Sequence, residues 1–253
     1  MKILYYTVAL DQKYMDTTVR LMANSFAKFH KEKLAVLTAQ DVAKAYPTPS
    51  YNHTFRVTPL TLMGLIENYD CVVRLDADQV IMGNLNHVTE GDFDVAVVQN
   101  SSPRDWTNHF LMTGQRLAVY DVDPLDYVNC GFVVVKSKRF VKHWFGLSNS
   151  PYFEQYPFRE QDILNLLVNY FPYKVKYLDR QPDNRWHGLI AKGYTPTAKL
   201  ENGKVIIPKD GEWVKEDKHL VCYHYAGGES VAKGKYRLLF PDDVSDHIAT
   251  LIK

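Results

Sequence analysis

The first part of the chain alternates short apolar runs with one long amphipathic pattern. Residues 2–9 and 33–38 are apolar runs with the length of a β-strand. Between them, residues 13–30 place apolar side chains at the spacing that gathers them on one face of a helix. These side chains are Met15, Val19, Met22, Phe26 and Phe29. A strand, a helix and a second strand in this order form a βαβ unit, so the sequence predicts a parallel sheet.

Further apolar segments continue this alternation. Residues 61–68 predict a helix that leads into a strand over 71–75, and the runs 93–98 and 130–135 predict two more strands. The polar stretch 99–128 has no strong periodicity, and connections of that length usually carry function or are mobile. We therefore expect one sheet with a long functional or mobile connection between two of its strands.

The second half adds a helix, a hairpin and a last strand. Apolar residues within 160–171 fall on one helical face, and 220–223 predicts a strand. Asn202-Gly203 separates two β-prone runs and predicts a hairpin turn. The whole pattern predicts an α/β fold, with a Rossmann-like, mostly parallel central sheet flanked by helices and a small β-hairpin toward the C-terminal part. No linker-like stretch divides residues 1–253, so we expect a single domain.

Composition argues against several classes of function. The chain has 30 basic and 29 acidic side chains, and its net charge of +1 gives no global argument for nucleic-acid or membrane binding, although basic residues gather in 136–142 and 233–237. The three cysteines are scattered, which fits neither a disulfide framework nor a close-spaced zinc site. The first apolar run is too short for a signal-peptide core, and no window approaches the ~18 apolar residues of a membrane span. We expect a cytoplasmic protein with no membrane span.

Two carboxylates stand directly after the predicted strand 71–75. Asp76 and Asp78 are two residues apart, so in an extended chain their side chains leave the same face. Both can then turn toward one divalent cation, which favours carboxylate oxygen and leaves positions open for phosphate. The alternative is a strand that simply ends in an Asx turn, which is common. In a parallel sheet, ligands bind beyond the carboxyl ends of the strands, and that is where this pair falls.

Three further segments carry polar side chains where strands or helices begin and end. Asn129 and Gly131 open an apolar strand; an amide suits sugar hydroxyls and a glycine allows close approach, but turn residues also punctuate strands. The acidic segment 160–162 starts a predicted helix, where acids can simply favour the helix dipole. His224 ends the last predicted strand; neutral imidazole suits Mn²⁺ better than Mg²⁺, although a lone histidine there is more often structural.

The segment 74–85 resembles the metal motif of nucleotide-sugar glycosyltransferases with the GT-A fold, above all the family 8 retaining group that includes glycogenin-like and bacterial galactosyl- and glucosyltransferases. Three more motifs follow in the family's order. Asn-Cys-Gly at 129–131 resembles its Asn-x-Gly element, Glu-Gln-Asp at 160–162 its Asp-Gln-Asp helix start, and His-Tyr-Ala-Gly at 224–227 its His-x-x-Gly. Four motifs in one order are more specific than any one of them, and the resemblance covers nearly the whole chain.

The resemblance implies a GT-A fold and an enzyme that moves a sugar from a nucleoside-diphosphate sugar, with UDP-sugars favoured, to a hydroxyl group of a glycan or another acceptor, with retention. It implies a Mn²⁺ (or Mg²⁺) cofactor held by Asp76, Asp78 and His224, and it places Gln161 and Asp162 at the catalytic centre. The residues that it assigns to the donor and its metal are Thr7, Val8, Ala9, Asp11, Arg74, Asp76, Ala77, Asp78, Asn129, Gly131, Gly227 and Lys233.

The chain departs from the family pattern in two places. The family's Lys-Pro-Trp after His-x-x-Gly is absent, which leaves Lys233 or Lys235 to neutralise the phosphates. Glu160 replaces the first aspartate of the helix motif. Both changes leave the donor identity and the acceptor geometry open.

Two other classes of function stay open at this point. A sugar nucleotidyltransferase also combines a metal with an α/β sheet, but it usually has a glycine-rich loop after the first strand, and residues 7–13 contain no glycine. A non-catalytic module that only binds a nucleotide sugar would keep the fold, although an intact Asp76, Asp78 and His224 favours an enzyme. A nucleic-acid acceptor finds no support in the net charge.

Overall fold

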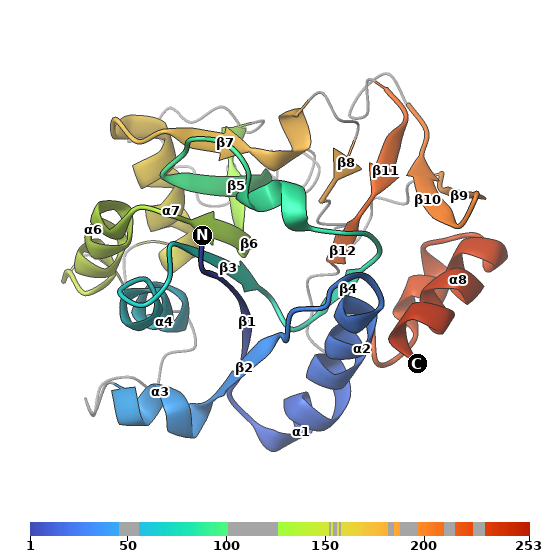
Figure 1. The fold of residues 1–253 in the computed structure, drawn as a ribbon, viewed down its shortest axis with the longest axis horizontal. Helices are drawn as coiled ribbons and strands as arrows, with labels where there is room; N and C mark the ends of the chain where they lie inside the picture. Colours follow the sequence, from blue (N-terminus) through green and yellow to red (C-terminus); the bar gives the residue numbers. More distant parts are fainter. Residues whose placement is uncertain are drawn as a thin grey trace.

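In the part of the chain that the structure describes, the central sheet has six strands in the order β2-β1-β3-β6-β5-β7 (Figure 1). The computed structural model describes residues 1–45, 56–100, 126–151, 153, 156, 158–181, 185–187, 197–209, 216–224 and 231–253. The strands of the sheet are β1 (Ile3–Ala9), β2 (Ala35–Thr38), β3 (Cys71–Leu75), β5 (Val95–Gln99), β6 (Val128–Val135) and β7 (Val175–Tyr177). The predicted α/β fold with a mostly parallel sheet is confirmed.

The direction of one strand sets the architecture of the site. β1 pairs in parallel with β2 and β3, and β5 pairs in parallel with β7. β6 lies between β3 and β5 and runs antiparallel to both. The first residues of β6 therefore lie at the same edge as the carboxyl end of β3.

Helices cover both faces of this sheet (Figure 1). The helices are α1 (Gln12–Tyr14), α2 (Arg20–Phe29), α3 (Ala39–Ala45), α4 (Val57–Leu65), α6 (Lys138–Ser148), α7 (Glu160–Tyr170) and α8 (Asp242–Ile252). Side chains of α4, α6 and α7 pack in one buried cluster with Val72 and Val133, whereas α2 packs on the other side with Tyr5 and Val73. Because both faces are covered, β3 is buried along its whole length, and its residues are apolar except for Arg74.

A second, smaller group of strands lies beside the central sheet (Figure 1). It has the order β8-β11-β10-β9, and a separate pair joins β12 to β4. Their bounds are β4 (Gln79–Ile81), β8 (Arg185–Trp186), β9 (Lys199–Glu201), β10 (Lys204–Ile207), β11 (Lys218–Leu220) and β12 (Cys222–His224). Short 3₁₀ turns cover Asn86–Thr89, Leu178–Arg180 and Lys235–Leu238. The strand predicted over 220–223 is thus divided at Val221 between two sheets.

The predicted hairpin turn is confirmed. β9 and β10 pair antiparallel around Asn202 and Gly203, whose φ angles are 50° and 73°. Positive φ at both central positions is the geometry of a type I′ turn, which asparagine and glycine tolerate best.

Two predicted helices differ from the structure in detail. The helix predicted over 13–30 contains a π-helical turn at Met15–Val19, which rotates the residues before it relative to α2. The helix predicted over 61–68 occupies 57–65 instead, because Val57 is buried and Pro59, in the first turn, needs no partner for its missing N–H. In the part of the chain that the structure describes, no helix has the length and apolar character needed to cross a membrane. Most of the connection predicted over 99–128 lies outside the described residues.

Candidate active site

The carboxyl end of β3 and the start of β6 form the floor of the site. Leu75 pairs with Phe132, and the N–H of Asp76 then donates to the carbonyl of Gly131 over 2.7 Å. The side-chain amide of Gln79 donates to the same carbonyl over 2.8 Å. The turn from β3 to β4 is therefore fixed to β6 at both of its ends.

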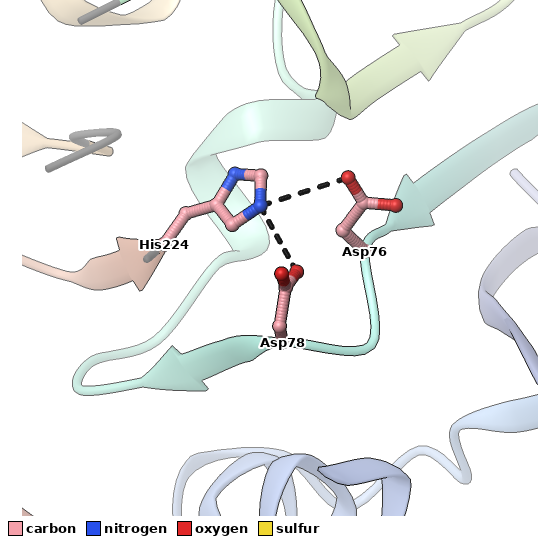
Figure 2. Close-up of side chains that lie close together, drawn as sticks. All are labelled: Asp76, Asp78 and His224. Atoms are coloured by element: carbon pink, nitrogen blue, oxygen red, sulfur yellow. Dashed lines mark ion pairs between the residues drawn. The ribbon is translucent and has the colours of Figure 1, made fainter. Parts of the chain in front are cut away.

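Figure 2 shows that Asp76 and Asp78, from the turn between β3 and β4, converge with His224 from a distant segment of the chain. Asp76 follows β3, Asp78 precedes β4, and His224 ends β12, which pairs antiparallel with β4 so that His224 lies opposite Gln79. Nε2 of His224 lies 3.0 Å from Oδ1 of Asp78 and 3.6 Å from Oδ2 of Asp76. One ligand atom of each residue lies within 4.8 Å of the others.

These three side chains fit a divalent cation. Ligands at about 2.1 Å from an octahedral ion stand about 3 Å apart when they are neighbours, which is close to the separations here. Two carboxylate oxygens and one imidazole nitrogen are a donor set that Mn²⁺ accepts well. Asp78 and His224 are buried and Asp76 is partly exposed, so the group has one open side. A ligand can complete the coordination from that side.

The side chains of His224 and Arg74 lie beside the carboxylates of the group. Burial lowers the pKa of His224, but the carboxylates of Asp78 and Asp76 outweigh burial, so its pKa lies above the ordinary value. The buried guanidinium of Arg74 lies 2.5 Å from Oδ1 of Asp76 and donates to the carbonyl of Cys130 over 2.9 Å. Arg74 thus orients one oxygen of Asp76 and leaves the other toward His224.

Gly131 has no room for a side chain. A Cβ atom at this position would stand 2.5 Å from Oδ2 of Asp76 and 2.7 Å from Oδ1 of Asn129, and it would also collide with Cε1 of His224. The glycine predicted to allow close approach therefore does so toward the candidate metal ligands themselves.

A cavity of about 360 Å³ opens beside the group. It is lined by Val8, Leu10, Asp11, Tyr14, Val57, Arg74, Asp76, Ala77 and Asp78. Six of the residues that the sequence assigned to the donor are among them. A cavity of this size, with both apolar and charged side chains in its wall, suits a nucleotide-sized ligand.

Two of the three donor residues predicted on β1 do not line this cavity. Thr7 and Ala9 are both buried, and successive residues of a strand alternate between its faces, so only Val8 of the three faces the cavity. Ala9 instead packs in a small buried cluster with Val19 and Ala77. Asp11 lines the cavity and also caps α1, because its Oδ1 accepts the N–H of Tyr14 over 2.7 Å.

Gln161 and Asp162 lie in the first turn of α7 and are both buried. Oε1 of Gln161 accepts from Nδ2 of Asn129 over 3.0 Å and from the N–H of Cys130 over 3.2 Å. The oxygens of Asp162 accept from the hydroxyl of Tyr127 over 2.6 Å and from the N–H of Phe158 over 2.8 Å. Burial raises the pKa of Asp162, and these two hydrogen bonds oppose the rise.

Asn129 connects Gln161 to the strand residues beside the candidate metal group, which is formed by Asp76, Asp78 and His224. Its Nδ2 donates to Gln161, and its Oδ1 accepts the N–H of Gly131 over 2.6 Å. Asn129 therefore spans the distance between the start of α7 and the candidate metal ligands.

Glu160 is buried as well. Burial raises its pKa well above the ordinary value, and among the described residues its Oε2 has no hydrogen-bond partner. The indole N–H of Trp144 donates to its backbone carbonyl over 3.0 Å, which fixes the start of α7 against α6.

Sequence reasoning missed four residues of this region. Tyr14 and Val57 line the cavity, and Gln79 and Tyr127 support its floor. The position of Gln79 inside the segment 74–85 was a usable signal, but Tyr14, Val57 and Tyr127 belong to no motif. Of the two remaining predicted donor residues, Gly227 lies outside the described residues, and Lys233 is exposed in the turn before Lys235–Leu238.

No protein-family model matches the sequence, and no curated protein matches it significantly. Solved structures do match. The galactosyltransferase LgtC in complex with donor and acceptor sugar analogs has a TM-score of 0.55 at 16% identity, covering 100% of this chain and 95% of LgtC. Mouse xyloside xylosyltransferase 1, in its apo form, has a TM-score of 0.55 at 11% identity, covering 88% of this chain and 98% of the mouse chain.

A third match is to a longer protein. The apo structure of the bifunctional glycosyltransferase WbbM has a TM-score of 0.54 at 14% identity, and the match covers 89% of this chain but only 46% of WbbM. The chain thus spans about half the length of that relative. At these identities a likeness establishes the fold alone, and the fold of this chain is the GT-A fold of these glycosyltransferases.

Proposed function

We propose that this chain is a metal-dependent glycosyltransferase that moves a sugar from a nucleoside-diphosphate sugar, with a UDP-sugar favoured, to a hydroxyl group of a glycan or another acceptor. One observation carries the proposal: the ligand atoms of Asp76, Asp78 and His224 lie within 4.8 Å of one another beside a cavity of about 360 Å³. The match to LgtC, solved with donor and acceptor sugar analogs, supports it.

Different residues of the cavity wall bind different parts of the donor in this proposal. The nucleoside binds against Val8, Asp11 and Ala77, which line the cavity. The diphosphate binds beside Arg74, Asp76 and Asp78, which line it as well. A bound Mn²⁺ supplies Lewis-acid stabilisation of the charge that develops on the leaving nucleoside diphosphate. The buried Arg74 adds a fixed positive charge beside it, in a place where water screens little.

The contacts of Asp162 favour transfer with retention. An inverting enzyme needs a carboxylate that is free to accept the proton of the acceptor hydroxyl. Both oxygens of Asp162 already accept hydrogen bonds from Tyr127 and Phe158, and the side chain is buried. In this proposal Asp162 is therefore a support for Gln161 and not a base. Proton NMR of the anomeric coupling in the product tests this: an inverted product from an α-linked donor contradicts it.

The proposal is tested with a panel of nucleotide sugars and Mn²⁺, scoring release of free nucleoside diphosphate. The assay needs no known acceptor because slow transfer to water reports turnover. The Asp78→Asn variant is the control, since it removes one carboxylate charge at nearly constant volume. Release that depends on Mn²⁺ in the parent and is lost in the variant supports the proposal. A parent with no release from any donor contradicts it.

The same panel separates the two other classes of function. A sugar nucleotidyltransferase consumes a nucleoside triphosphate and a sugar phosphate and releases pyrophosphate, so it forms the donor instead of breaking it. If the chain is only a binding module, a nucleotide sugar should raise its melting temperature, and no nucleoside diphosphate should be released.

A further inference from the structure

Tyr127 lies immediately before β6 and belongs to none of the four motifs. It is almost completely buried, with 1% of its surface exposed. Burial raises the pKa of its phenol well above the ordinary value, and the neighbouring Asp162 raises it further. The phenol therefore holds its proton more firmly than a free tyrosine does, which suits its role as a hydrogen-bond donor.

The hydroxyl is the meeting point of two hydrogen bonds. It donates to Oδ1 of Asp162 over 2.6 Å, and it accepts from Nε2 of Gln161 over 3.4 Å. The short bond to a carboxylate is charge-assisted and is the stronger of the two. Because Asp162 is also held by the N–H of Phe158, the phenol is anchored to the start of α7.

These contacts determine which way the amide of Gln161 faces. The backbone N–H of Cys130 can only donate, so the atom that it contacts must be Oε1 of Gln161. The Nε2 group then faces Tyr127, whose proton is committed to Asp162 and whose oxygen is left to accept. Among the described residues, the phenol oxygen is the atom that accepts from Nε2 of Gln161.

The chain of contacts continues to the candidate metal group. Gln161 is joined to Asn129, Asn129 accepts the N–H of Gly131, and the carbonyl of Gly131 accepts the N–H of Asp76. An unbroken series of hydrogen bonds thus runs from Asp162 through Tyr127 to the first metal ligand. Networks of this kind are worth more than the sum of their members when each one is satisfied.

We infer that Tyr127 is a positioning residue for the proposed transfer, whose hydroxyl fixes the orientation of Gln161 and Asp162 next to the metal group. The expected effect on kcat rests on the proposed function, whereas the orientation of Gln161 by the phenol does not. Tyr127 touches neither donor nor cation in this view, and its effect passes through Gln161.

The test is the Tyr127→Phe variant of the full chain, which removes one oxygen and keeps the ring. We expect kcat to fall about 10- to 100-fold, because a displacement of ~1 Å near the reacting atoms can cost ~100-fold. The KM for the donor and the Mn²⁺ concentration for half activity should stay within about three-fold, since Tyr127 lines neither the cavity nor the metal group. A purely structural phenol would lower the melting temperature and leave kcat per folded molecule unchanged, which would overturn the inference.

Tyr173→Phe is the matched control. Its hydroxyl also pairs with a side chain, Nδ1 of His143, over 3.0 Å, but that pair lies between the start of β7 and α6, away from the metal group. Tyr173→Phe should leave kcat unchanged. A double-mutant cycle with Asp162→Asn adds a second check, because residues of one network couple. If the fall in kcat of the double variant equals the product of the falls in the two single variants, the two residues act independently, which would count against a shared role.

A crystal structure of the Tyr127→Phe variant separates failure of this inference from failure of the proposed function. We expect the Gln161 side chain to leave its place beside Asn129 and Cys130. A Gln161 that stays in place refutes the positioning role whatever the activity. A parent without Mn²⁺-dependent turnover refutes the proposed function, while a displaced Gln161 in the variant still supports the positioning role.

Discussion

Replacing Gly131 by alanine should damage the metal group more than the fold. The added Cβ would stand 2.5 Å from Oδ2 of Asp76 and 2.7 Å from Oδ1 of Asn129, and Cε1 of His224 is also in its way. Carbon and oxygen atoms in contact keep well over 3 Å apart, so these side chains must retreat by about 0.5–1 Å. The φ angle of Gly131 does not lie in the positive region, so the alanine backbone itself is not strained.

The size of the effect follows from which atoms must move. Overpacking of this kind costs about 1–3 kcal/mol of stability, which a protein of this size usually survives. Displacing a metal ligand or its support commonly costs ~10- to 100-fold in metal affinity. We therefore expect Gly131→Ala to raise the Mn²⁺ concentration for half activity by about that factor.

The assay is a Mn²⁺ titration of nucleoside diphosphate release, with thermal unfolding measured without metal. Gly146→Ala is the matched control, because a Cβ at Gly146 meets nothing within 4 Å and the residue lies inside α6. That variant should keep the parental titration and gain about 0.5–1 kcal/mol of stability, as alanine does over glycine in a helix. A Gly131→Ala variant that titrates like the parent would refute the placement of the metal group.

Three further outcomes are expected. Asp78→Asn should abolish Mn²⁺-dependent turnover with little change in the melting temperature without metal, and turnover within a few-fold of the parent would contradict the metal assignment. His224→Ala should raise the Mn²⁺ requirement by ~10- to 100-fold; an unchanged titration with a lowered melting temperature would mean a structural histidine. Burial, with Lys204 and Arg185 next in effect, lowers the pKa of His219 from 6.5 to about 4. As the pH falls below 6.5, His219 takes up a proton in the unfolded chain before it does so in the folded chain. The contribution of His219 to stability is therefore full above pH 6.5 and is lost as the pH falls toward about 4. The free energy of unfolding by urea should therefore vary less with pH across that window in His219→Gln than in the parent.

The strand that carries the carboxylates was predicted with its observed bounds. Cys71–Leu75 is buried along its whole length, and a short, mostly apolar run is typical of a strand in a sheet covered on both faces. The helix after β1 was predicted less well, because the π-helical turn at Met15–Val19 leaves the apolar spacing nearly unchanged. That turn follows Tyr14, which lines the cavity, so the missed detail lies where the site is built.

The candidate metal ligands were identifiable because each stands at the end of a predicted strand within a motif. The residues that support these ligands were harder to identify from the sequence. Tyr127 acts through hydrogen bonds to residues distant in sequence, and no spacing rule marks such partners. Gln79 lies inside the segment 74–85, but its partner Gly131 is distant in sequence as well. The resemblance assigned Thr7, Val8 and Ala9 to the donor. Side chains alternate between the two faces of a strand, however, and only Val8 of the three faces the cavity.

The direction of β6 explains why motifs so far apart in sequence form one site. Nothing in the apolar run 130–135 marks which way the strand runs. Had it run parallel to β3, its first residues would lie at the opposite edge of the sheet, about five residues or roughly 16 Å from Asp76. Because β6 runs antiparallel, Asn129 and Gly131 stand beside the carboxyl end of β3 instead, and the N–H of Asp76 bonds to Gly131. One reversed strand therefore turns two separate strand-end motifs into neighbours, and any variant that disturbs the pairing of β6 with β3 should impair metal binding even if every ligand is intact.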